Sequence, residues 1–162
     1  LLTIFPKVVT WASNNPMKSH KLSLKKRQNL LGILVNSIDN NNLELSQELS
    51  SPWTIETIAE ASKKWPNSHF TFVIGSDLIT QMLTWKNVKR LLQTTYIGVA
   101  PRQGWPLRKD DINKIESLGG KIHLLPLKIP LTASSEIRDN TSISNIPDCI
   151  MDVIVKENPK YK

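Results

Sequence analysis

The stretch Phe70–Asp77 reads FTFVIGSD, an uncharged run of aromatic and β-branched residues that stops at a Gly-Ser-Asp cluster. A run of this kind is typical of a buried strand in a parallel sheet. In open parallel sheets, ligands bind beyond the C-terminal ends of the strands, which is where the cluster falls. The stretch therefore predicts a strand over Phe70–Ile74 and a ligand-binding edge directly after it.

The segments on either side alternate between strand and helix patterns. Val8–Ala12 is a second uncharged run, and Leu24–Ile38 carries an apolar stripe at helical spacing. Strands that alternate with helices predict an α/β fold, a single Rossmann-like domain over residues 1–162 with a mostly parallel sheet and helices on both faces. The other expected strands are Leu43–Leu45, Thr95–Ala100 and Ile122–Leu125; the other expected helices run from Ser51-Pro52 to about Trp65, after Asp77 to about Gln93, over Asp110–Leu118, from Ser134, and over Pro147–Lys156.

The amino-acid composition excludes several classes of protein. The chain has 162 residues, 40% of them hydrophobic and 22% charged, which is close to the globular norm and excludes disorder as the main state. One cysteine excludes a disulfide framework, and with no visible signal peptide or membrane span we expect a cytoplasmic protein that does not bind membranes. The net charge of +7 favours anionic ligands. The chain starts at Leu1 as if in mid-element, so we expect an N-terminal segment to be absent from it.

Four polar clusters follow the predicted strands. The first is the loop Asn14–Lys21, whose amides, lysines and histidine can hold a phosphate, although an ordinary polar turn would look the same. In the second, Gly75 allows a close backbone approach and Asp77 can accept hydrogen bonds from ribose hydroxyls, or simply cap the next helix.

The other two clusters add an anion site and an aromatic site. Ser134 and Ser135 begin a predicted helix and Arg138 lies one turn further on, which suits either phosphate oxygens or a capping box with a surface arginine. The fourth cluster combines flat aromatic rings, hydroxyls and a cation, as a site for a heterocycle would, although most of the tryptophans are expected in the core. Its members are Trp53, Thr54, Thr57, Trp85 and Arg102.

Other chemistry finds little support in the sequence. Neither GxxxxGK[ST] nor GxGxxG occurs, and no GxSxG elbow supports a serine nucleophile. The three histidines lack zinc-ligand spacing, so we expect no protein-bound metal site, and Cys149 falls in a helix pattern where packing is expected.

Taken in order, these clusters resemble the bacterial nicotinate-nucleotide adenylyltransferases, and the resemblance covers nearly the whole chain. WASNNPMKSHK follows the first strand, SPWTIETI opens a helix, and FVIGSDL precedes Trp85 by the expected distance. VAPRQG and ASSEIR complete the set. FVIGSD…W and ASSEIR are similar to the family's FIIGAD…W and ISSTEIR patterns.

The resemblance implies an enzyme that transfers the adenylyl group of ATP to nicotinate mononucleotide in NAD biosynthesis, with Mg²⁺ accompanying ATP. No nucleic acid is expected as a partner, and a homo-oligomer is compatible with this interpretation. By position in the family motifs, the resemblance implies that the catalytic residues are Lys18, His20 and Arg138. The implied contacts to ATP are Gly75, Asp77, Ser134, Ser135 and Arg138. The implied contacts to the mononucleotide are Asn14, Lys21, Thr54, Thr57, Trp85 and Arg102, and Lys18 and His20 are further candidates for binding its phosphate.

Two departures from the family pattern leave alternatives open. The glycine-rich turn and HxGH motif expected near the N-terminus are not in the sequence, which we attribute to truncation or disorder. Ala133 takes the place of the first serine in Ser-Ser-Thr. The alternatives are an enzyme of the same fold that uses nicotinamide mononucleotide and a catalytically silent nucleotide-binding protein. A nucleic-acid-binding module is disfavoured because the basic residues are scattered along the chain.

Overall fold

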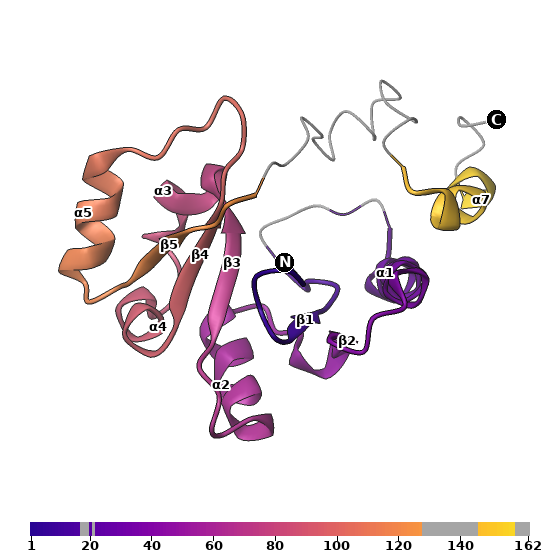
Figure 1. The fold of residues 1–162 in the computed structure, drawn as a ribbon, viewed down its shortest axis with the longest axis horizontal. Coiled ribbons are helices and arrows are strands. Elements are labelled where there is room, and N and C mark those ends of the chain that lie inside the picture. The colour runs from indigo at the N-terminus through magenta and orange to yellow at the C-terminus, as the bar shows by residue number, and fades with distance from the viewer. Residues whose placement is uncertain (17–19, 21, 128–145, 158–162) are drawn as a thin grey trace. The chain divides into compact units, whose positions relative to one another are not determined.

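The computed structural model describes residues 1–16, 20, 22–127 and 146–157. The chain divides into two compact units (Figure 1). Unit 1 comprises Leu1–Pro52 and Thr132–Lys162, and unit 2 comprises Trp53–Leu131.

Unit 1 is built on a pair of parallel strands, β1 (Val8–Thr10) and β2 (Leu43–Leu45). The helix α1 (Leu24–Ile38) connects them and packs against β2 and against α7 (Asp148–Glu157). A short 3-10 helix, η1 (Gln47–Leu49), follows β2. Parallel neighbours need a crossover connection of this kind, and α1 supplies it.

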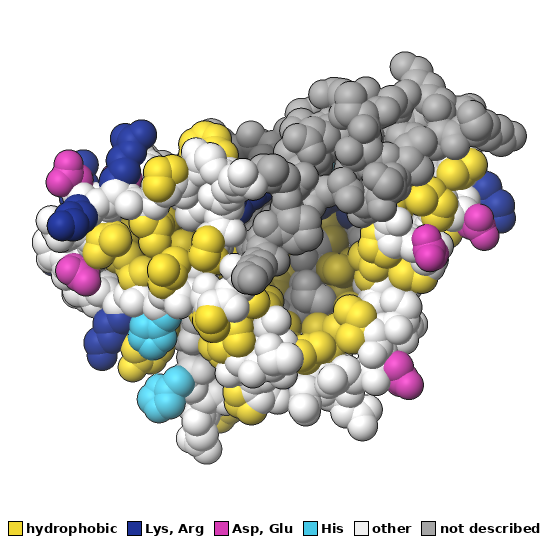
Figure 2. Space-filling model, turned by 45° about the horizontal axis from the view of Figure 1, so that its top comes forward, with side chains coloured by type: hydrophobic (Ala, Val, Ile, Leu, Met, Phe, Trp, Pro, Cys, Tyr) yellow, Lys and Arg dark blue, Asp and Glu magenta, His cyan; other side chains and the backbone are white. Residues whose placement is uncertain are grey.

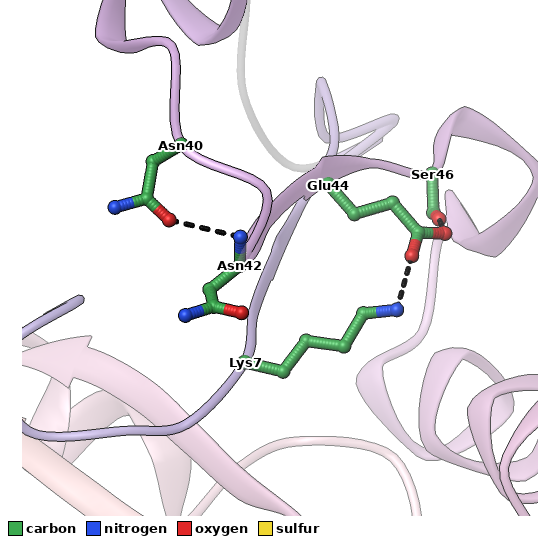
Figure 3. Close-up of polar contacts among 5 residues, drawn as sticks. All are labelled: Lys7, Asn40, Asn42, Glu44 and Ser46. Atoms are coloured by element: carbon green, nitrogen blue, oxygen red, sulfur yellow. Dashed lines mark hydrogen bonds and ion pairs between the residues drawn. The ribbon is translucent and has the colours of Figure 1, made fainter.

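The start of the β1–β2 pair is fixed by polar contacts (Figure 3). Asn40 Oδ1 accepts a hydrogen bond from the backbone N–H of Asn42, which forms the turn before β2. Lys7 forms an ion pair with Glu44, whose other carboxylate oxygen accepts a hydrogen bond from the buried hydroxyl of Ser46. These contacts set the register in which Val8 lies opposite Leu43.

Unit 2 contains a three-stranded parallel sheet in the order β3-β4-β5. β4 packs against α4 and β5 against α5, while α2 packs against α4 (Figure 1). The elements in chain order are α2 (Thr54–Lys64), β3 (Thr71–Gly75), η2 (Ser76–Leu78), α3 (Ile79–Met82), α4 (Val88–Thr94), β4 (Tyr96–Ala100), α5 (Lys109–Ser117) and β5 (Ile122–Leu124).

The core of unit 2 lies around the middle strand. Ile97 and Val99 of β4 are fully buried, and Met82, Leu92 and Ile115 from the surrounding helices join them in one apolar cluster. Because β4 is covered on both faces, its sequence YIGVA is uncharged throughout. This core holds the ends of the strands, and therefore the residues after them, in fixed positions.

The α/β class and the parallel pairing of the strands are confirmed, although the described strands are divided between two sheets, one in each unit. Two helix predictions were wrong. The helix expected from Ser51-Pro52 begins only at Thr54, as α2, after an extended Trp53. The single helix expected up to Gln93 is broken between α3 and α4, where Asn87 adopts a left-handed backbone with φ 52°.

The expected end of α5 is confirmed, and its cause is visible. Gly119 has φ +86°, and its N–H donates to the carbonyl of Glu116, while the N–H of Gly120 donates to Ile115. This pair of bonds is the Schellman arrangement that a glycine after the last turn permits. Within the described part of the chain, none of the helices has the length and apolar character that crossing a membrane requires.

Candidate functional site

The candidate site of unit 2 lies at the C-terminal edge of its sheet. Gly75, the last residue of β3, is the register partner of Ala100, the last residue of β4. The residues that follow the two strands therefore leave the sheet at the same place. This register brings Asp77 and Arg102 together, although 25 positions separate them in the sequence.

Asp77 and Arg102 form an ion pair at this edge. Arg102 Nη1 donates to Asp77 Oδ2 at 3.0 Å, and the two side chains keep 33% and 23% of their surface exposed. The backbone N–H of Arg102 donates to the hydroxyl of Ser76, which is buried, at 2.9 Å. This bond therefore ties Arg102, the second residue after β4, to Ser76, the first residue after β3.

Gly75 leaves room for the ion pair. A Cβ atom on this residue would lie 2.3 Å from Asp77 Oδ1 and 2.9 Å from Arg102 Cδ, both far inside van der Waals contact. Its φ of −72° is open to any residue. The glycine is therefore explained by the close approach of two charged side chains and not by its backbone conformation.

A pocket of about 170 Å³ opens beside Asp77. Its lining includes a second carboxylate, the buried Asp111, which accepts a hydrogen bond from the hydroxyl of Thr80 at 2.9 Å. Its rim carries the exposed Trp105, on a tight turn in which the Trp105 N–H donates to the Arg102 carbonyl. Gly104 has φ +82° in that turn, a conformation that favours glycine. The pocket thus offers carboxylates, an aromatic ring and a cation, Arg108, to a ligand.

The predicted pyridine residues lie on α2 and on the loop between α3 and α4. Trp85 is half-buried and meets Phe72 edge to face, with ring centroids 6.1 Å apart. Thr54 is half-buried, whereas Thr57 is only 2% exposed, so its hydroxyl is not offered to a ligand in this structure. Trp53 is at the surface.

Lys86 connects this loop to the start of α2. Its Nζ lies 2.9 Å from Glu56 Oε1 and 5.0 Å from the centre of the Trp53 ring. The ion pair is half exposed, so by itself it contributes little to stability. These contacts place Lys86, the neighbour of Trp85, beside the first turn of α2.

The predicted phosphate loop belongs to unit 1. Asn14 and His20 are both exposed there. Arg27 closes the base of the loop, because its guanidinium donates to the carbonyl of Ser13 at 2.6 Å and to that of Leu22 at 3.3 Å. Before the loop, Gln47 pairs with both backbone groups of Ala12, and Ser50 adds a third bond to that residue.

Five of the predicted site residues lie outside the described residues. They are Lys18, Lys21, Ser134, Ser135 and Arg138. Within the described residues, no group of three His, Cys, Asp or Glu side chains is placed to hold a metal ion. On the face shown in Figure 2, lysines and arginines are interspersed with acidic side chains, and they do not form one continuous basic surface.

Sequence reasoning missed three residues that position predicted site residues within their own unit: Ser76 and Lys86 in unit 2, and Arg27 in unit 1. Ser76 is part of the quoted Gly-Ser-Asp cluster, but its role depends on the register between β3 and β4, which the sequence does not specify. Arg27 falls off the apolar stripe of α1 and looks like an ordinary surface residue. Lys86 follows Trp85 directly, and that proximity is the one clue the sequence carries.

Comparison with known proteins finds relatives of this chain that share one name. No protein-family model matches the chain. A probable nicotinate-nucleotide adenylyltransferase of Synechocystis is 29% identical over 93% of the chain and 82% of its own length. Relatives of the same name from Bacillus mycoides and Flavobacterium psychrophilum are 33% and 30% identical. The alignments cover 65% and 78% of this chain, and the chain spans 60% and 66% of those two relatives.

Solved structures agree on the fold. A Plasmodium falciparum nicotinic acid mononucleotide adenylyltransferase complexed with NaAD superimposes with a TM-score of 0.68 and 21% identity, over 93% of this chain and 79% of that one. The same enzyme complexed with APC gives a TM-score of 0.66. This likeness confirms the fold, and the curated relatives confirm the resemblance indicated by the motifs. The chain belongs to the nicotinate-nucleotide adenylyltransferase family.

Proposed function

We propose that this chain transfers the adenylyl group of ATP to nicotinate mononucleotide, giving deamido-NAD and pyrophosphate. The observation that carries the proposal is the meeting of Asp77 and Arg102 at the C-terminal edge of a parallel sheet in a chain of this family. A carboxylate suits ribose hydroxyls and a guanidinium suits a phosphate, so one edge offers groups for both substrates.

The reaction needs no protein nucleophile. An oxygen of the mononucleotide 5′-phosphate attacks the α-phosphorus of ATP, a new P–O bond forms, and the bond to the β-phosphate breaks as pyrophosphate leaves. The protein contributes by placing the two phosphates together and by stabilising the charge that develops. In this proposal Mg²⁺ enters with ATP, bound to its phosphate oxygens, and would neutralise part of their negative charge.

Each substrate has its own set of residues in this proposal. Gly75 and Asp77 receive the adenosine part of ATP, while Trp85 and Thr54 receive the pyridine ring. Arg102 contacts the mononucleotide phosphate. Thr57 also belongs to the proposed pyridine site, but because it is buried, its part is to support the residues that contact the ring. The loop residues Asn14, Lys18, His20 and Lys21 are assigned to the mononucleotide phosphate, and Ser134, Ser135 and Arg138 to the phosphates of ATP.

Product analysis tests the activity directly. The purified chain is incubated with ATP, Mg²⁺ and either nicotinate or nicotinamide mononucleotide, and dinucleotide and pyrophosphate are separated by chromatography. We expect deamido-NAD from the nicotinate substrate. Product only with the nicotinamide substrate would instead identify a sister enzyme of the same fold, and nucleotide binding without product would identify a silent binding protein.

A pair of arginine variants tests the site. Arg102→Met removes the proposed phosphate contact, and we expect its loss to cost about 1.5–3 kcal/mol in mononucleotide binding, as for other charged hydrogen bonds. Arg90→Met is the matched control, because Arg90 is exposed on α4. If the two variants kept the same KM for the mononucleotide, the assignment of Arg102 would be wrong.

Arg138→Ala tests the ATP side. Because a charged contact to a phosphate contributes about 1.5–3 kcal/mol, we expect the KM for ATP to rise while the KM for the mononucleotide changes little. Initial rates measured at varied ATP and at varied mononucleotide separate the two effects. An unchanged dependence on ATP would remove Arg138 from the proposed phosphate site.

A further inference from the structure

A second pocket of unit 2 lies at the edge of the sheet opposite to the candidate site. The strands β3, β4 and β5 are parallel, so the residues that precede them meet at one edge, just as the residues that follow them meet at the other. The N–H of Tyr96 donates to the carbonyl of Phe70 at 2.9 Å, which fixes β4 against the start of β3 at this edge. The residues gathered around the pocket include His69, Thr95 and Lys121.

The pocket is small and is bounded by two helix ends. Its volume is about 190 Å³, and α4 supplies Gln93 and Thr94 from its last turn, while Gly119 follows α5. A Cβ on Gly119 would lie 3.4 Å from Gln93 Cγ, so the two helix ends are in contact. At ~30 Å³ per liquid water, the space equals about six water molecules, which suits a small organic molecule and is too small for a nucleotide.

Thr95 contributes a buried hydroxyl to the lining of this pocket. The residue is 5% exposed, and its Oγ1 has no hydrogen-bond partner among the described residues. The neighbouring Thr94 differs, because its hydroxyl donates to the carbonyl of Arg90 at 2.9 Å. A buried hydroxyl without a partner is unfavourable, and such groups are rare in folded proteins. The hydroxyl of Thr95 therefore indicates a polar ligand that enters the pocket.

The lining of the pocket carries a positive charge. Lys121 supplies it, and no aspartate or glutamate is among the described residues that line the pocket. The Nζ atom of Lys121 lies 5.3 Å from the centre of the Tyr96 ring. The face of an aromatic ring attracts an ammonium group but does not neutralise its charge. Within the part of the chain that the structure describes, Lys121 thus brings an uncompensated charge to the pocket.

We propose that this pocket binds a small monocarboxylate. The single negative charge of the ligand balances the single permanent charge of the lining, and its oxygens accept hydrogen bonds from the ammonium of Lys121 and from the hydroxyl of Thr95. Thr95 reaches the ligand by rotation about its Cα–Cβ bond, a change between staggered rotamers that leaves the backbone in place. This site is independent of the proposed function, which uses the opposite ends of β3 and β4.

Titration of the full chain with propionate tests the site, and propionamide is the neutral control molecule of the same shape. Proton–nitrogen correlation spectra follow the backbone amides of Thr95 and Lys121. We expect both signals to shift and to saturate at millimolar propionate, and propionamide to bind at least about tenfold more weakly, because it offers no charged hydrogen bond. Shifts that do not saturate, or equal affinities for the two molecules, would overturn the proposal.

Inorganic phosphate is the second probe, because it separates a carboxylate site from a site for any anion. Phosphate carries more negative charge than the lining balances, so it should bind more weakly than propionate. Tighter binding of phosphate, detected at the same two amides, would contradict the assignment to a monocarboxylate.

Lys121→Met tests the charge and keeps the aliphatic stem of the side chain. We expect the affinity for propionate to fall at least about tenfold, the loss of one charged hydrogen bond. Lys114→Met is the matched control, since Lys114 is exposed on α5 and does not line the pocket. If the two variants lost affinity equally, the net charge of the chain would explain the binding and the proposed site would be refuted.

Thr95→Val provides a test with an unusual sign. Valine keeps the shape of threonine but removes the unpaired hydroxyl, so the variant without ligand should have a higher thermal midpoint than the wild type and should bind propionate more weakly. Thr84→Val is the comparison for stability, because the hydroxyl of Thr84 donates to the carbonyl of Gln81 and its removal should bring no gain. A lower midpoint for Thr95→Val, or an unchanged affinity for propionate, would overturn the role of Thr95.

Discussion

At Gly75 the ion pair between Asp77 and Arg102 lies directly against the backbone, and this contact makes the smallest residue necessary. Gly75→Ala would place a methyl group 2.3 Å from Asp77 Oδ1, so the pair must separate or shift. We expect the variant to lose most of its adenylyl transfer and to be destabilised by about 1–3 kcal/mol, the usual cost of overpacking. Chemical denaturation and product analysis measure the two effects.

Gly32→Ala is the control for that experiment. Gly32 lies inside α1, and a Cβ there would meet only Leu45 Cδ2, at an ordinary distance of 3.5 Å. Alanine in a helix interior is favoured over glycine by about 0.5–1 kcal/mol, so this variant should be stabilised. If Gly75→Ala behaved like Gly32→Ala, the packing argument for Gly75 would be wrong.

Trp85 combines a structural role with a proposed binding role. It packs edge to face on Phe72 and joins the periphery of the core, so Trp85→Ala should raise the KM for the mononucleotide and also cost about 2–4 kcal/mol of stability. Trp85→Phe keeps a ring beside Phe72 and should recover most of the stability. Steady-state kinetics with each substrate varied would contradict the assignment if only the KM for ATP rose.

Among the elements, the loop Asn14–Lys21 depends on a residue outside it. Arg27, from the first turns of α1, donates to carbonyls at both ends of the loop. Arg27→Met keeps the aliphatic stem but removes these bonds, and we expect the KM for the mononucleotide to rise several-fold with a stability loss of about 1–2 kcal/mol. Lys25→Met, an exposed lysine on the same helix, is the control and should change neither quantity.

Elements whose boundaries have a local cause could be predicted from the sequence. α1 and β2 have the expected bounds, and α5 ends at the glycine that its sequence provides. The break before α4 could not be predicted, because it depends on Asn87 in a left-handed conformation in the middle of an otherwise helical pattern. Residues 83–87 turn there so that Trp85 can reach Phe72, which is a tertiary contact.

The candidate site, like the helices and strands, could be predicted from the sequence only in part. Position after a strand was enough to select Asp77 and Arg102, since parallel strands bring their ends to one edge. The bond between them was not predictable, because it requires the register of Gly75 against Ala100 and the space left by a missing side chain. The family pattern assigned the two residues to different substrates, and the structure shows them paired.

For the whole molecule, substrates should act as stabilisers. A ligand that binds only the folded chain adds about 2.7 kcal/mol to the free energy of unfolding at one hundred times its Kd. We expect the thermal midpoint to rise with nicotinate mononucleotide or with an ATP analogue that has a methylene group between the α- and β-phosphates, and to rise further with both. Scanning calorimetry measures this, and a midpoint that stays unchanged with both ligands at such concentrations would show that the folded chain does not bind them.

The division of the chain into units has a consequence for its synthesis. Unit 2 is one uninterrupted run, Trp53–Leu131, whereas unit 1 needs α1 from the first segment and α7 from the last. As the polypeptide emerges from the ribosome, the three-stranded sheet can be completed while α1 still lacks its partner helix. The apolar stripe of α1 then remains exposed until α7 has been synthesised, which makes it the natural point of contact for a chaperone on the nascent chain.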